Sequence, residues 1–268
     1  MSSKPMTYQQ IRNSTAKLFY NGVTILVDPF LAPKEFYPGF DMAPAPELKK
    51  MRLPLNDLPM TVEEVIKDID AVIITHTHYD HWDEHAAKAI PKNIPIFVQD
   101  AADKKVVEKD GFTDIRVVGV NTPFKGLTIT KTSGQHGTDE MFSNPTIAEN
   151  FGHSMGFVFK APGLKSVYFA GDTVWHDYVE VAINRHKPDY IVLNAAYCHY
   201  DGLVGSSMMG VDDVKKCYEF CKTAKIITSH FDSFCHARYT SDMMRKFVEE
   251  NKLQDRVLVP KDGETLNL

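Results

Sequence analysis

Cysteine is scarce in this sequence: its 268 residues include four, Cys198, Cys217, Cys221 and Cys235. Four are too few for a disulfide framework in a chain of this length. Cys217 and Cys221 lie four residues apart in a helix-like segment, so we expect them to pack in the core rather than bind a metal. The sequence also lacks an apolar run long enough to span a membrane, and its polar first residues, MSSKPMTYQQIRNSTAK, lack the apolar core of a signal peptide. We therefore expect a cytoplasmic protein with no membrane partner.

Positive charge is not in excess either. Lysine and arginine number 30 against 35 aspartates and glutamates, which gives a net charge of -5 and an isoelectric point near 6.1. A surface that neutralises phosphates is therefore not expected, and we predict no nucleic-acid partner. Repeats, low-complexity tracts and linkers are missing from the sequence as well, so we predict one domain over residues 1–268. The expected partner is a small-molecule substrate, and the chain could form a homo-oligomer.

The apolar pattern alternates between strands and helices. Asn21-Gly22 is a strong hairpin signal because both residues tolerate positive φ, and it joins strands expected over Ala16–Tyr20 and Val23–Val27. Further strands are expected over residues 71–75, 94–98, 115–118, 127–132, 155–159, 166–170, 190–193, 225–228 and near 257. Helices are expected over residues 61–69, 83–90, 101–109, 176–185, 211–221 and 240–251, with a loop over 133–152. Hairpins that interleave with β-α units indicate an α/β protein with a mixed sheet and outer helices.

Residues 29–59 break this pattern. The segment is rich in proline and in apolar side chains such as Phe30, Tyr37, Phe40 and Met51. Irregular segments of this length are usually functional or disordered, and the aromatic side chains favour an ordered flap over a linker. A flap that shapes a substrate site and a loop that simply packs on the core are both open interpretations.

The densest chemical signal is the segment His76-x-His78-x-Asp80-His81, which follows the apolar run over residues 71–74. In an extended stretch His76 and His78 point to the same side and can bind one metal ion. Asp80 and His81 come after the chain turns and can reach a second ion. Neutral imidazole and carboxylate suit Zn²⁺ and similar first-row ions. This spacing arises by chance in roughly one such chain per thousand, so it predicts a metal site.

This pattern resembles the signature of the metallo-β-lactamase fold superfamily, whose other metal-site motifs also have counterparts here. His136 follows an expected strand, in the segment SGQHG, and Asp172 follows another, in AGDT. His230 comes after the late apolar run IITS, and Asp28 stands at the end of an early strand, in ILVDP. The resemblance implies an α/β fold, namely an αβ/βα four-layer sandwich with two mixed sheets. It places two metal ions at the edge of the facing sheets.

The ligands that this resemblance implies form two sets and a bridge: His76, His78 and His136; Asp80, His81 and His230; and, between them, Asp172. Asp28 would orient a ligand without binding metal. The expected cofactors are two divalent ions, zinc first, with manganese, iron or nickel as alternatives. A narrower resemblance, to small bacterial hydrolases similar to L-ascorbate-6-phosphate lactonase, rests on Trp82-Asp83, on the QHG around the third histidine and on the VPKDGET near the end of the chain.

A metal-dependent hydrolase is the function that the resemblance implies. Two cations that share a water lower its pKa toward neutrality, and the metal-bound hydroxide would attack a small ester, lactone or phosphoester. Asp80 and Asp172 could also pass a proton. The alternatives are a phosphodiesterase or nuclease of the same fold, a non-hydrolytic redox metalloprotein and a metal-binding protein without catalysis. The acidic composition argues against a nuclease, and His78 stands where the diiron members carry glutamate.

Several histidines outside the motif could serve the reaction. His199, in the loop after the strand over 190–193, could be a general acid or an oxyanion donor, or an exposed histidine. His153 and His176 could face the pocket. His236, together with Arg238, could contact an anionic substrate, although this rests on nearness to His230 in the sequence alone.

Other residues beside the motifs have structural interpretations. We expect His85 on the exposed face of a helix that Asp83 caps, and Trp82 packed beneath the site. Met208 and Met209 could line an adaptable apolar pocket or fill the core.

Overall fold

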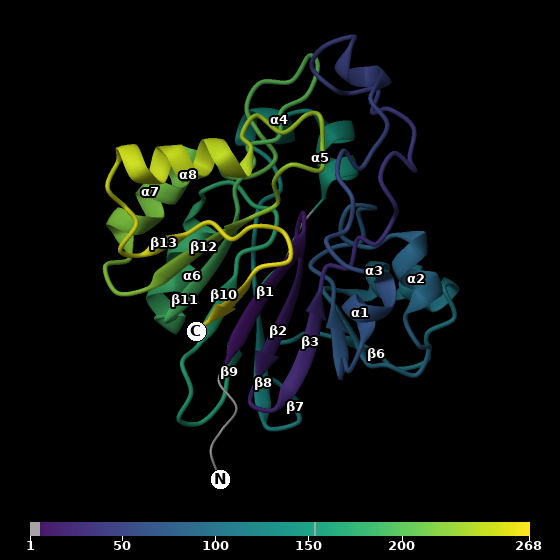
Figure 1. The fold of residues 1–268 in the computed structure, drawn as a ribbon, viewed down its shortest axis with the longest axis vertical. Helices are drawn as coiled ribbons and strands as arrows, with labels where there is room; N and C mark the ends of the chain where they lie inside the picture. Colours follow the sequence, from purple (N-terminus) through teal and green to yellow (C-terminus); the bar gives the residue numbers. More distant parts are fainter. Residues whose placement is uncertain (1–5, 153) are drawn as a thin grey trace.

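Two β-sheets lie face to face in the computed structural model, which describes residues 6–152 and 154–268, and helices cover the outer face of each sheet (Figure 1). The first sheet has the order β14-β1-β2-β3-β4-β5-β6, which is Thr265–Asn267, Thr7–Arg12, Thr15–Tyr20, Val23–Val27, Ala71–Ile73, Ile96–Val98 and Ile115–Val117. The second has the order β13-β12-β11-β10-β9-β8-β7, which is Val257–Leu258, Lys225–Ser229, Tyr190–Asn194, Val167–Phe169, Gly156–Lys160, Leu127–Thr132 and Thr122–Phe124.

Both sheets are mixed, as predicted. Strands β1, β2 and β3 are antiparallel neighbours, whereas β3 to β6 run parallel. In the second sheet β10 to β13 are parallel, and β7 to β10 are antiparallel. Asn21 and Gly22 have φ of 52° and 77° and form the predicted hairpin, with Tyr20 paired to Val23.

The strand residues alternate between two cores, which fixes the layers. In β3, Ile25 and Val27 join the cluster between the two sheets, whereas Leu26 faces the helices. The first sheet is covered by α1 (Val62–Ile66), α2 (Glu84–Ala89) and α3 (Ala101–Lys109). The second is covered by α4 (Asp139–Phe142), α5 (Pro145–Phe151), α6 (Asp177–His186), α7 (Val211–Phe220) and α8 (Ser241–Glu250). The αβ/βα four-layer sandwich is therefore confirmed.

Several element boundaries differ from the sequence-based expectation. Helix α1 starts at a capping box on Thr61 but ends at Ile66 rather than residue 69, because Lys67 is extended and Asp68 has a φ of 57°. The expected loop over 133–152 contains α4 and α5, which begin at side-chain caps on Thr138 and Asn144. The sequence analysis also missed β1, β7 and β14. Strand β1 reads TYQQIR, and its polar letters hid a strand whose Tyr8 and Gln10 are both buried.

The predicted packing of Cys217 and Cys221 and the predicted helix cap at Asp83 are confirmed. All four cysteines are free and buried, and Cys217 and Cys221 belong to the core between the second sheet and its helices. Asp83 caps α2 by accepting from the Ala86 N–H, and Trp82 is buried against Phe112. Among the described residues, no helix combines the length and the apolar character that crossing a membrane would require.

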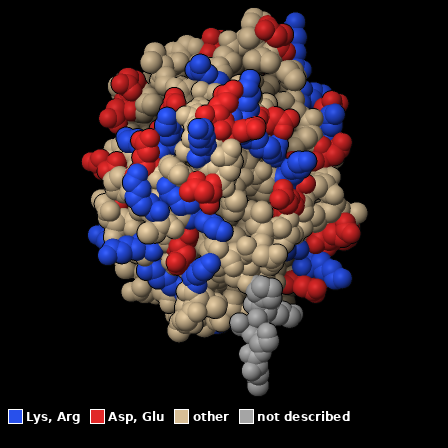
Figure 2. Space-filling model, turned by 60° about the vertical axis from the view of Figure 1, so that its left-hand side comes forward, with Lys and Arg blue, Asp and Glu red and all other residues tan. Residues whose placement is uncertain are grey.

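Acidic and basic side chains are interspersed over the face of the molecule shown in Figure 2. That face of the described chain carries no broad patch of a single sign, in keeping with the small net charge of the sequence. The absence of a nucleic-acid partner stays a prediction.

The flap, residues 29–59, is ordered against the body of the protein. It contains a 3-10 helix, η1 (Leu48–Lys50), and a single bridge between Tyr37 and Leu53. Its buried members Phe30 and Leu53 form a cluster with Phe234, from the loop after β12. The segment is therefore packed rather than a linker.

Arg12 fastens the flap to β1. Its side chain is fully buried, and its guanidinium donates to the carbonyl oxygens of Phe30 and Ala32, each at 2.9 Å, and of Asn56 at 3.2 Å. The same group lies 4.7 Å from the centre of the Phe30 ring. Burial lowers the pKa of Arg12 to about 10, against the opposing field of Asp83, so the cation persists at neutral pH.

We expect Arg12→Met to lower the free energy of unfolding by about 3 kcal/mol, because three buried carbonyls lose a charged donor. Arg52→Met is the matched control: Arg52 also donates to the flap, to the Glu35 carbonyl at 2.7 Å, but it is exposed. For Arg52→Met the free energy of unfolding should change by no more than about 0.5 kcal/mol. Urea denaturation measures both, and hydrogen exchange should show faster exchange over residues 30–56 in Arg12→Met alone. Equal stabilities of the two variants would contradict this role of Arg12.

Candidate metal centre

Polar side chains gather where parallel strands of both sheets end. Asp28 follows β3 and the histidine motif follows β4 in the first sheet, while Asp172 follows β10 and His230 follows β12 in the second. The crevice beyond the carboxyl ends of parallel strands is the usual place for a site in α/β folds. The two sheets therefore bring residues far apart in the sequence to one edge.

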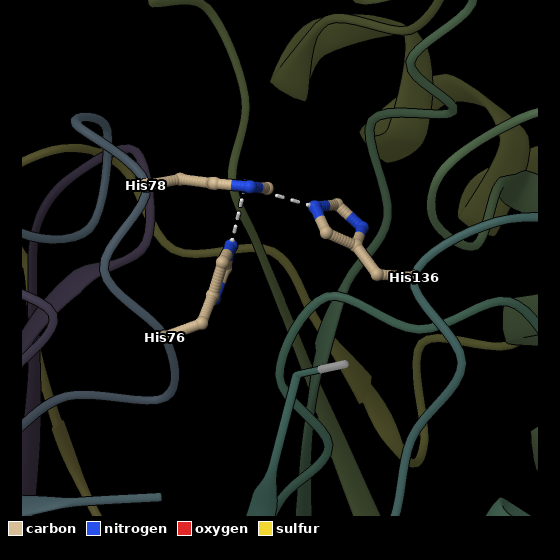
Figure 3. Close-up of side chains that lie close together, drawn as sticks. All are labelled: His76, His78 and His136. Carbon is tan, nitrogen blue, oxygen red and sulfur yellow. Dashed lines mark hydrogen bonds between the residues drawn. The ribbon is translucent and has the colours of Figure 1, made fainter. Parts of the chain in front are cut away.

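The first cluster is a trio of histidines, His76, His78 and His136 (Figure 3). Nε2 of His76 lies 2.9 Å from Nδ1 of His78, and Nε2 of His136 lies 3.2 Å from that same Nδ1. The remaining nitrogens are held from outside: Nε2 of His78 faces the Asn150 carbonyl at 3.1 Å, and Nδ1 of His136 faces the Ser207 carbonyl at 2.8 Å. A ring that donates to a carbonyl on one side presents its lone pair on the other, as a metal ligand must.

Burial keeps two rings of this trio neutral. It lowers the pKa of His136 to about 4 and that of His76 well below its ordinary value, and nearby histidines add to the shift of His76. A neutral imidazole is the form that binds metal.

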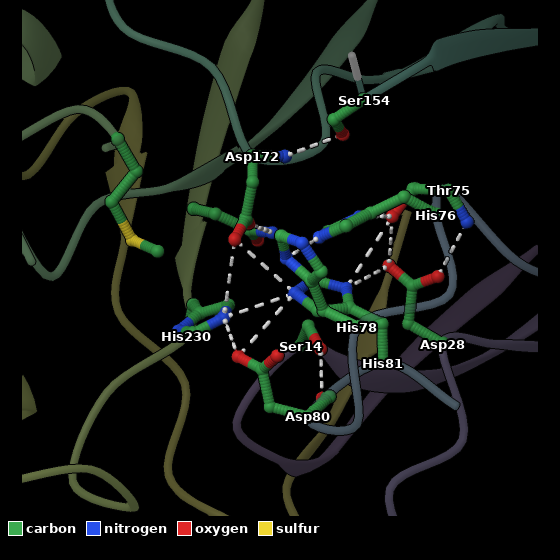
Figure 4. A network of polar contacts seen from close by, with 12 residues as sticks. Ser14, Asp28, Thr75, His76, His78, Asp80, His81, Ser154, Asp172 and His230 are labelled. Atoms are coloured by element: carbon green, nitrogen blue, oxygen red, sulfur yellow. Dashed lines mark hydrogen bonds and ion pairs between the residues drawn. The ribbon is translucent and has the colours of Figure 1, made fainter. Parts of the chain in front are cut away.

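The second cluster contains Asp80, His81, Asp172 and His230 (Figure 4). Nε2 of His81 lies 3.2 Å from Oδ2 of Asp172 and 3.2 Å from Nε2 of His230, and His230 lies 3.2 Å from Oδ2 of Asp80. Oδ2 of Asp172 is also 3.7 Å from Nε2 of His136, in the first cluster. Asp172 thus lies between the two clusters, where the bridging ligand is expected.

The buried carboxylates around the second cluster favour a positive charge beside them. Burial disfavours a charged His81, yet the carboxylates of Asp172, Asp80 and Asp28 together raise its pKa well above the ordinary value. Burial likewise opposes ionisation of Asp172, but His81 and His230 hold its pKa well below the usual range. In the described part of the chain, the ion pairs of these carboxylates are all with histidines. The field that favours a proton on His81 would favour a divalent ion there equally well.

The donor atoms therefore fit two divalent ions. Within each cluster the ligand atoms lie within 4.8 Å of one another, and they are the imidazole nitrogens and carboxylate oxygens that first-row ions prefer. Metal binding by these residues, the number of ions and the preference for zinc stay predictions.

Asp28 holds the end of the motif in place. Its carboxylate accepts from the Thr75 N–H at 2.7 Å and from the Thr75 hydroxyl at 2.9 Å, and it lies 2.9 Å from Nδ1 of His81. With Nδ1 bound to Asp28, Nε2 of His81 is directed at the second cluster. This is the orienting position that the resemblance implied for Asp28.

Two supporting residues were missed by the sequence analysis, Asn194 and Asn13. Asn194 donates to Oδ1 of Asp172 at 2.7 Å, which leaves Oδ2 to face the histidines. Asn13 donates to the Asp80 carbonyl at 3.1 Å, and its own carbonyl accepts from the His230 N–H at 3.0 Å. Asn194 could have been noticed, since it is a polar residue at the end of a predicted apolar strand. No local signal singled out Asn13.

Glycine in the Gly-Asp-Thr motif has a geometric reason. Gly171 has a φ of 71°, and a Cβ at this position would lie 2.5 Å from the Met155 carbonyl oxygen. Only glycine allows the backbone to pass so close and to deliver Asp172 to the site.

A cavity of about 180 Å³ opens onto both clusters. Its polar floor includes His78, Asp80, His136 and Asp172. Apolar and aromatic side chains form most of the wall: Phe40, Met42, Tyr79, Phe151, Tyr200, Met208 and Phe234, beside Asn150 and His236. The flap thus supplies Phe40 and Met42 to the cavity, so it both packs on the body and shapes the site.

The structure distinguishes between the histidines whose roles the sequence left undecided. His236 lines the cavity, whereas His199, proposed as a catalytic residue, is not among the lining residues. Arg238 is exposed and stacks near Tyr197 and Tyr239, so it does not join His236 at the site. His153 lies outside the described residues.

Three further expectations have mixed outcomes. His85 is half-buried, with its ring 4.5 Å from that of Phe36, so the prediction of an exposed position was wrong. His176 caps α6 and lines a separate cavity. Met208 lines the metal-side cavity, and Met209 is buried in the core against the helices. Tyr37 and Met51, from the flap, do not line the cavity.

Comparison with known proteins places these motifs in a family. Residues 24–231 match the Beta-lactamase superfamily domain. The chain is 38% identical over 262 residues to the UPF0173 protein YddR of Bacillus subtilis, covering 97% of this chain and 99% of that protein. The lactonase resemblance stays a prediction.

Two solved structures are similar over almost the whole chain. A possible metal-dependent hydrolase from Veillonella parvula has a TM-score of 0.96 and 41% identity, covering 99% of this chain and 100% of that one. An isothiocyanate hydrolase from Delia radicum gut bacteria has a TM-score of 0.93 and 40% identity, covering 98% of this chain and 99% of that one.

Protein purified without chelators is expected to hold about two divalent ions per chain. We expect His136→Ala and His230→Ala each to lose about one ion, and Asp172→Ala to lower the occupancy of both clusters, because its carboxylate lies between them. Elemental mass spectrometry after zinc saturation and desalting gives the counts, with His186→Ala as the control that keeps both ions. Fewer than about half an ion per chain in the wild type would contradict metal binding at this site.

Asp28→Asn should weaken metal binding at the second cluster by about 10- to 100-fold. The amide can still accept from Thr75, but its NH₂ group would face Nδ1 of His81 donor to donor. Competition with a chromophoric chelator should show one weakened ion and one unchanged ion. Equal weakening of both ions would mean that Asp28 supports the fold of the site rather than His81.

Proposed function

The chain belongs to the beta-lactamase superfamily as a metal-dependent hydrolase, and on this premise we propose that its substrate is a small, uncharged electrophile with an apolar substituent, for which an isothiocyanate is the best example. The observation that carries this proposal is the chemistry of the cavity wall.

The cavity favours a small apolar molecule. Its volume of about 180 Å³ is modest, and seven of its lining residues are phenylalanine, tyrosine or methionine. Among the described residues that line it, none is lysine or arginine, the side chains that usually pair with phosphate or carboxylate groups. A neutral substrate would gain from burial here, whereas an anionic one would find only the metal site to balance its charge.

Similarity to the isothiocyanate hydrolase supports the choice of electrophile. An isothiocyanate, R–N=C=S, is linear and uncharged, and its reactive carbon lies next to an apolar R group. Such a molecule could place the carbon over the polar floor while R contacts Phe40, Phe151 and Phe234 along the wall.

The histidine and aspartate clusters would hold divalent ions that lower the pKa of a water and polarise the electrophile. As water adds, its oxygen bonds to the carbon and the C=N π pair moves to nitrogen. One water proton ends on nitrogen and the other on sulfur, which gives the thiocarbamic acid R–NH–C(=O)–SH. Loss of carbonyl sulfide then leaves the amine R–NH₂, with no other reactant.

Asp80 is the side chain best placed to carry the proton. Its ion pairs run through Oδ2, so Oδ1 is free among the described residues, and the residue lines the cavity. Both oxygens of Asp172 are engaged, Oδ1 by Asn194 and Oδ2 by the histidines. We therefore assign proton transfer to Asp80 and bridging to Asp172.

A lactone or a neutral ester is the second candidate, because it shares the uncharged carbonyl-like carbon and the apolar substituent. A phosphodiester or nucleic-acid substrate finds less support in a wall without cationic side chains. Nothing in the cavity favours redox chemistry.

A substrate panel on zinc-loaded protein tests the proposal. We expect kcat/KM for benzyl isothiocyanate to exceed that for bis(4-nitrophenyl) phosphate by at least about 100-fold, with a neutral lactone between them. Loss of the isothiocyanate absorbance and release of benzylamine measure the first reaction. Asp80→Asn should lower kcat by about 100-fold or more at equal metal content. Faster turnover of the phosphodiester than of every neutral substrate would overturn the proposal.

A further inference from the structure

His236 lies in a fixed position on the wall of the metal-side cavity. It belongs to the loop between β12 and α8, and its carbonyl accepts from the His199 N–H at 3.1 Å. The next residue, Ala237, forms a bridge with Cys198. The backbone of His236 is thus tied to the loop that carries Tyr200, another wall residue.

Three aromatic rings hold the imidazole plane. The ring centre of His236 lies 4.7 Å from that of Phe40, 5.2 Å from that of Tyr200 and 5.5 Å from that of Phe234. The residue is only 7% exposed. Because Phe40 comes from the flap, Tyr200 from the loop after β11 and Phe234 from the histidine's own loop, the ring is packed from several sides and has little freedom to rotate.

Neither nitrogen of the His236 ring forms a hydrogen bond within the described part of the chain. Nδ1 is buried and has no hydrogen-bond partner among the described residues, and no bond to Nε2 is found there either. Buried polar groups normally find partners, so a ring that lines a cavity with neither nitrogen bonded to the described protein can offer a nitrogen to a ligand. His199 also has an unpaired Nδ1, but it does not line the cavity.

Burial keeps His236 neutral. It lowers the pKa of the ring to about 4, although Asp80 and Asp172 act in the opposite direction. A neutral imidazole has one N–H and one lone pair, so it can donate a hydrogen bond without carrying a charge. Neutral histidines are known to polarise substrate heteroatoms in this way.

We propose that His236 is a catalytic residue whose N–H donates to the substrate heteroatom on which negative charge develops as water attacks the neighbouring carbon. The inference rests on the proposed function, because it needs an uncharged electrophile in this cavity. In an isothiocyanate the heteroatom is the nitrogen that receives the C=N π pair. His236 keeps its proton throughout, and the proton that nitrogen gains comes from water by way of Asp80.

The test compares His236→Phe with His236→Gln in the zinc-loaded protein. Phenylalanine preserves the aromatic packing and removes the donor, whereas glutamine restores a donor. We expect His236→Phe to lower kcat for benzyl isothiocyanate by about 100-fold with KM changed less than about threefold, and His236→Gln to recover about a tenth of the activity or more. His186→Phe, on a helix end away from the cavity, is the matched control and should keep full activity.

A substituent series gives a signature that a structural role would not produce. With para-substituted phenyl isothiocyanates, the deficit of His236→Phe should grow as the substituent becomes less able to stabilise charge on nitrogen. Metal content and melting temperature should match the wild type. Unchanged kcat in His236→Phe, or a loss that tracks lost metal, would overturn the inference.

A binding measurement separates this inference from the proposed function. Phenylthiourea, an uncharged and unreactive analogue, should shift the imidazole signals of His236 in a long-range ¹H–¹⁵N spectrum of the zinc-loaded wild type. The wild type could fail to hydrolyse isothiocyanates and still show this shift, and His236→Phe could slow hydrolysis of a neutral ester or lactone that the wild type does turn over. In that case the proposed isothiocyanate substrate is wrong, and the proposed role of His236 stands. Absence of any shift would overturn the role itself.

Discussion

The charge balance around Asp172 is the constraint on which the rest of the site depends. A carboxylate buried to this extent is costly unless it is hydrogen-bonded and matched by positive charge. Asn194, from the second sheet, donates to the carboxylate, and His81 reaches it from the first. The backbone N–H of Asp172 donates to the Ser154 hydroxyl, which fixes the main chain that carries the group. The hairpins, the parallel strands and the glycine before Asp172 all serve to bring these partners to one edge without solvent. With these partners in place, the two clusters of candidate ligands lie on either side of the Asp172 carboxylate.

The walls of the cavity have a different origin from its floor. The floor comes from residues that directly follow strands, so its geometry is set by the two sheets. Apart from Tyr79, which belongs to the histidine motif, the wall comes from the flap, from α5 and from the loops after β11 and β12. Aromatic contacts join these segments, and a bridge between Cys198 and Ala237 links the two loops. Arg12 holds the flap to β1. A wall of this kind can change its side chains without disturbing the floor, so a floor of the same geometry can serve different substrates.

This division explains how much could be predicted from the sequence. The fold class and the gathering of the candidate ligand residues at one edge could be predicted because the motif residues are adjacent in the sequence or follow apolar strands, where the local pattern fixes both place and direction. Helices α4 and α5 were missed because each is short and stands in a polar segment, so caps alone mark them. Strand β1 was missed because its buried Gln10 bonds to Asn13 and Ser229, partners that only the folded chain supplies. His199 and His236 could not be ranked for the same reason: both are histidines in loops, and only the packing shows which one faces the cavity.

The pairing of β14 with β1 has a consequence for how the chain is made. Thr7 to Gln9 pair with residues 265–267, so β1 finds its outer neighbour only after the other strands of both sheets have been synthesised. His230 likewise must reach Asn13, whose carbonyl accepts its N–H. During translation the three histidines of the first cluster are therefore all present well before His230, which completes the second cluster. A chain cut short before β12 would carry six of the seven strands of the first sheet and five of the seven strands of the second, but it would lack His230 and so have no complete second cluster.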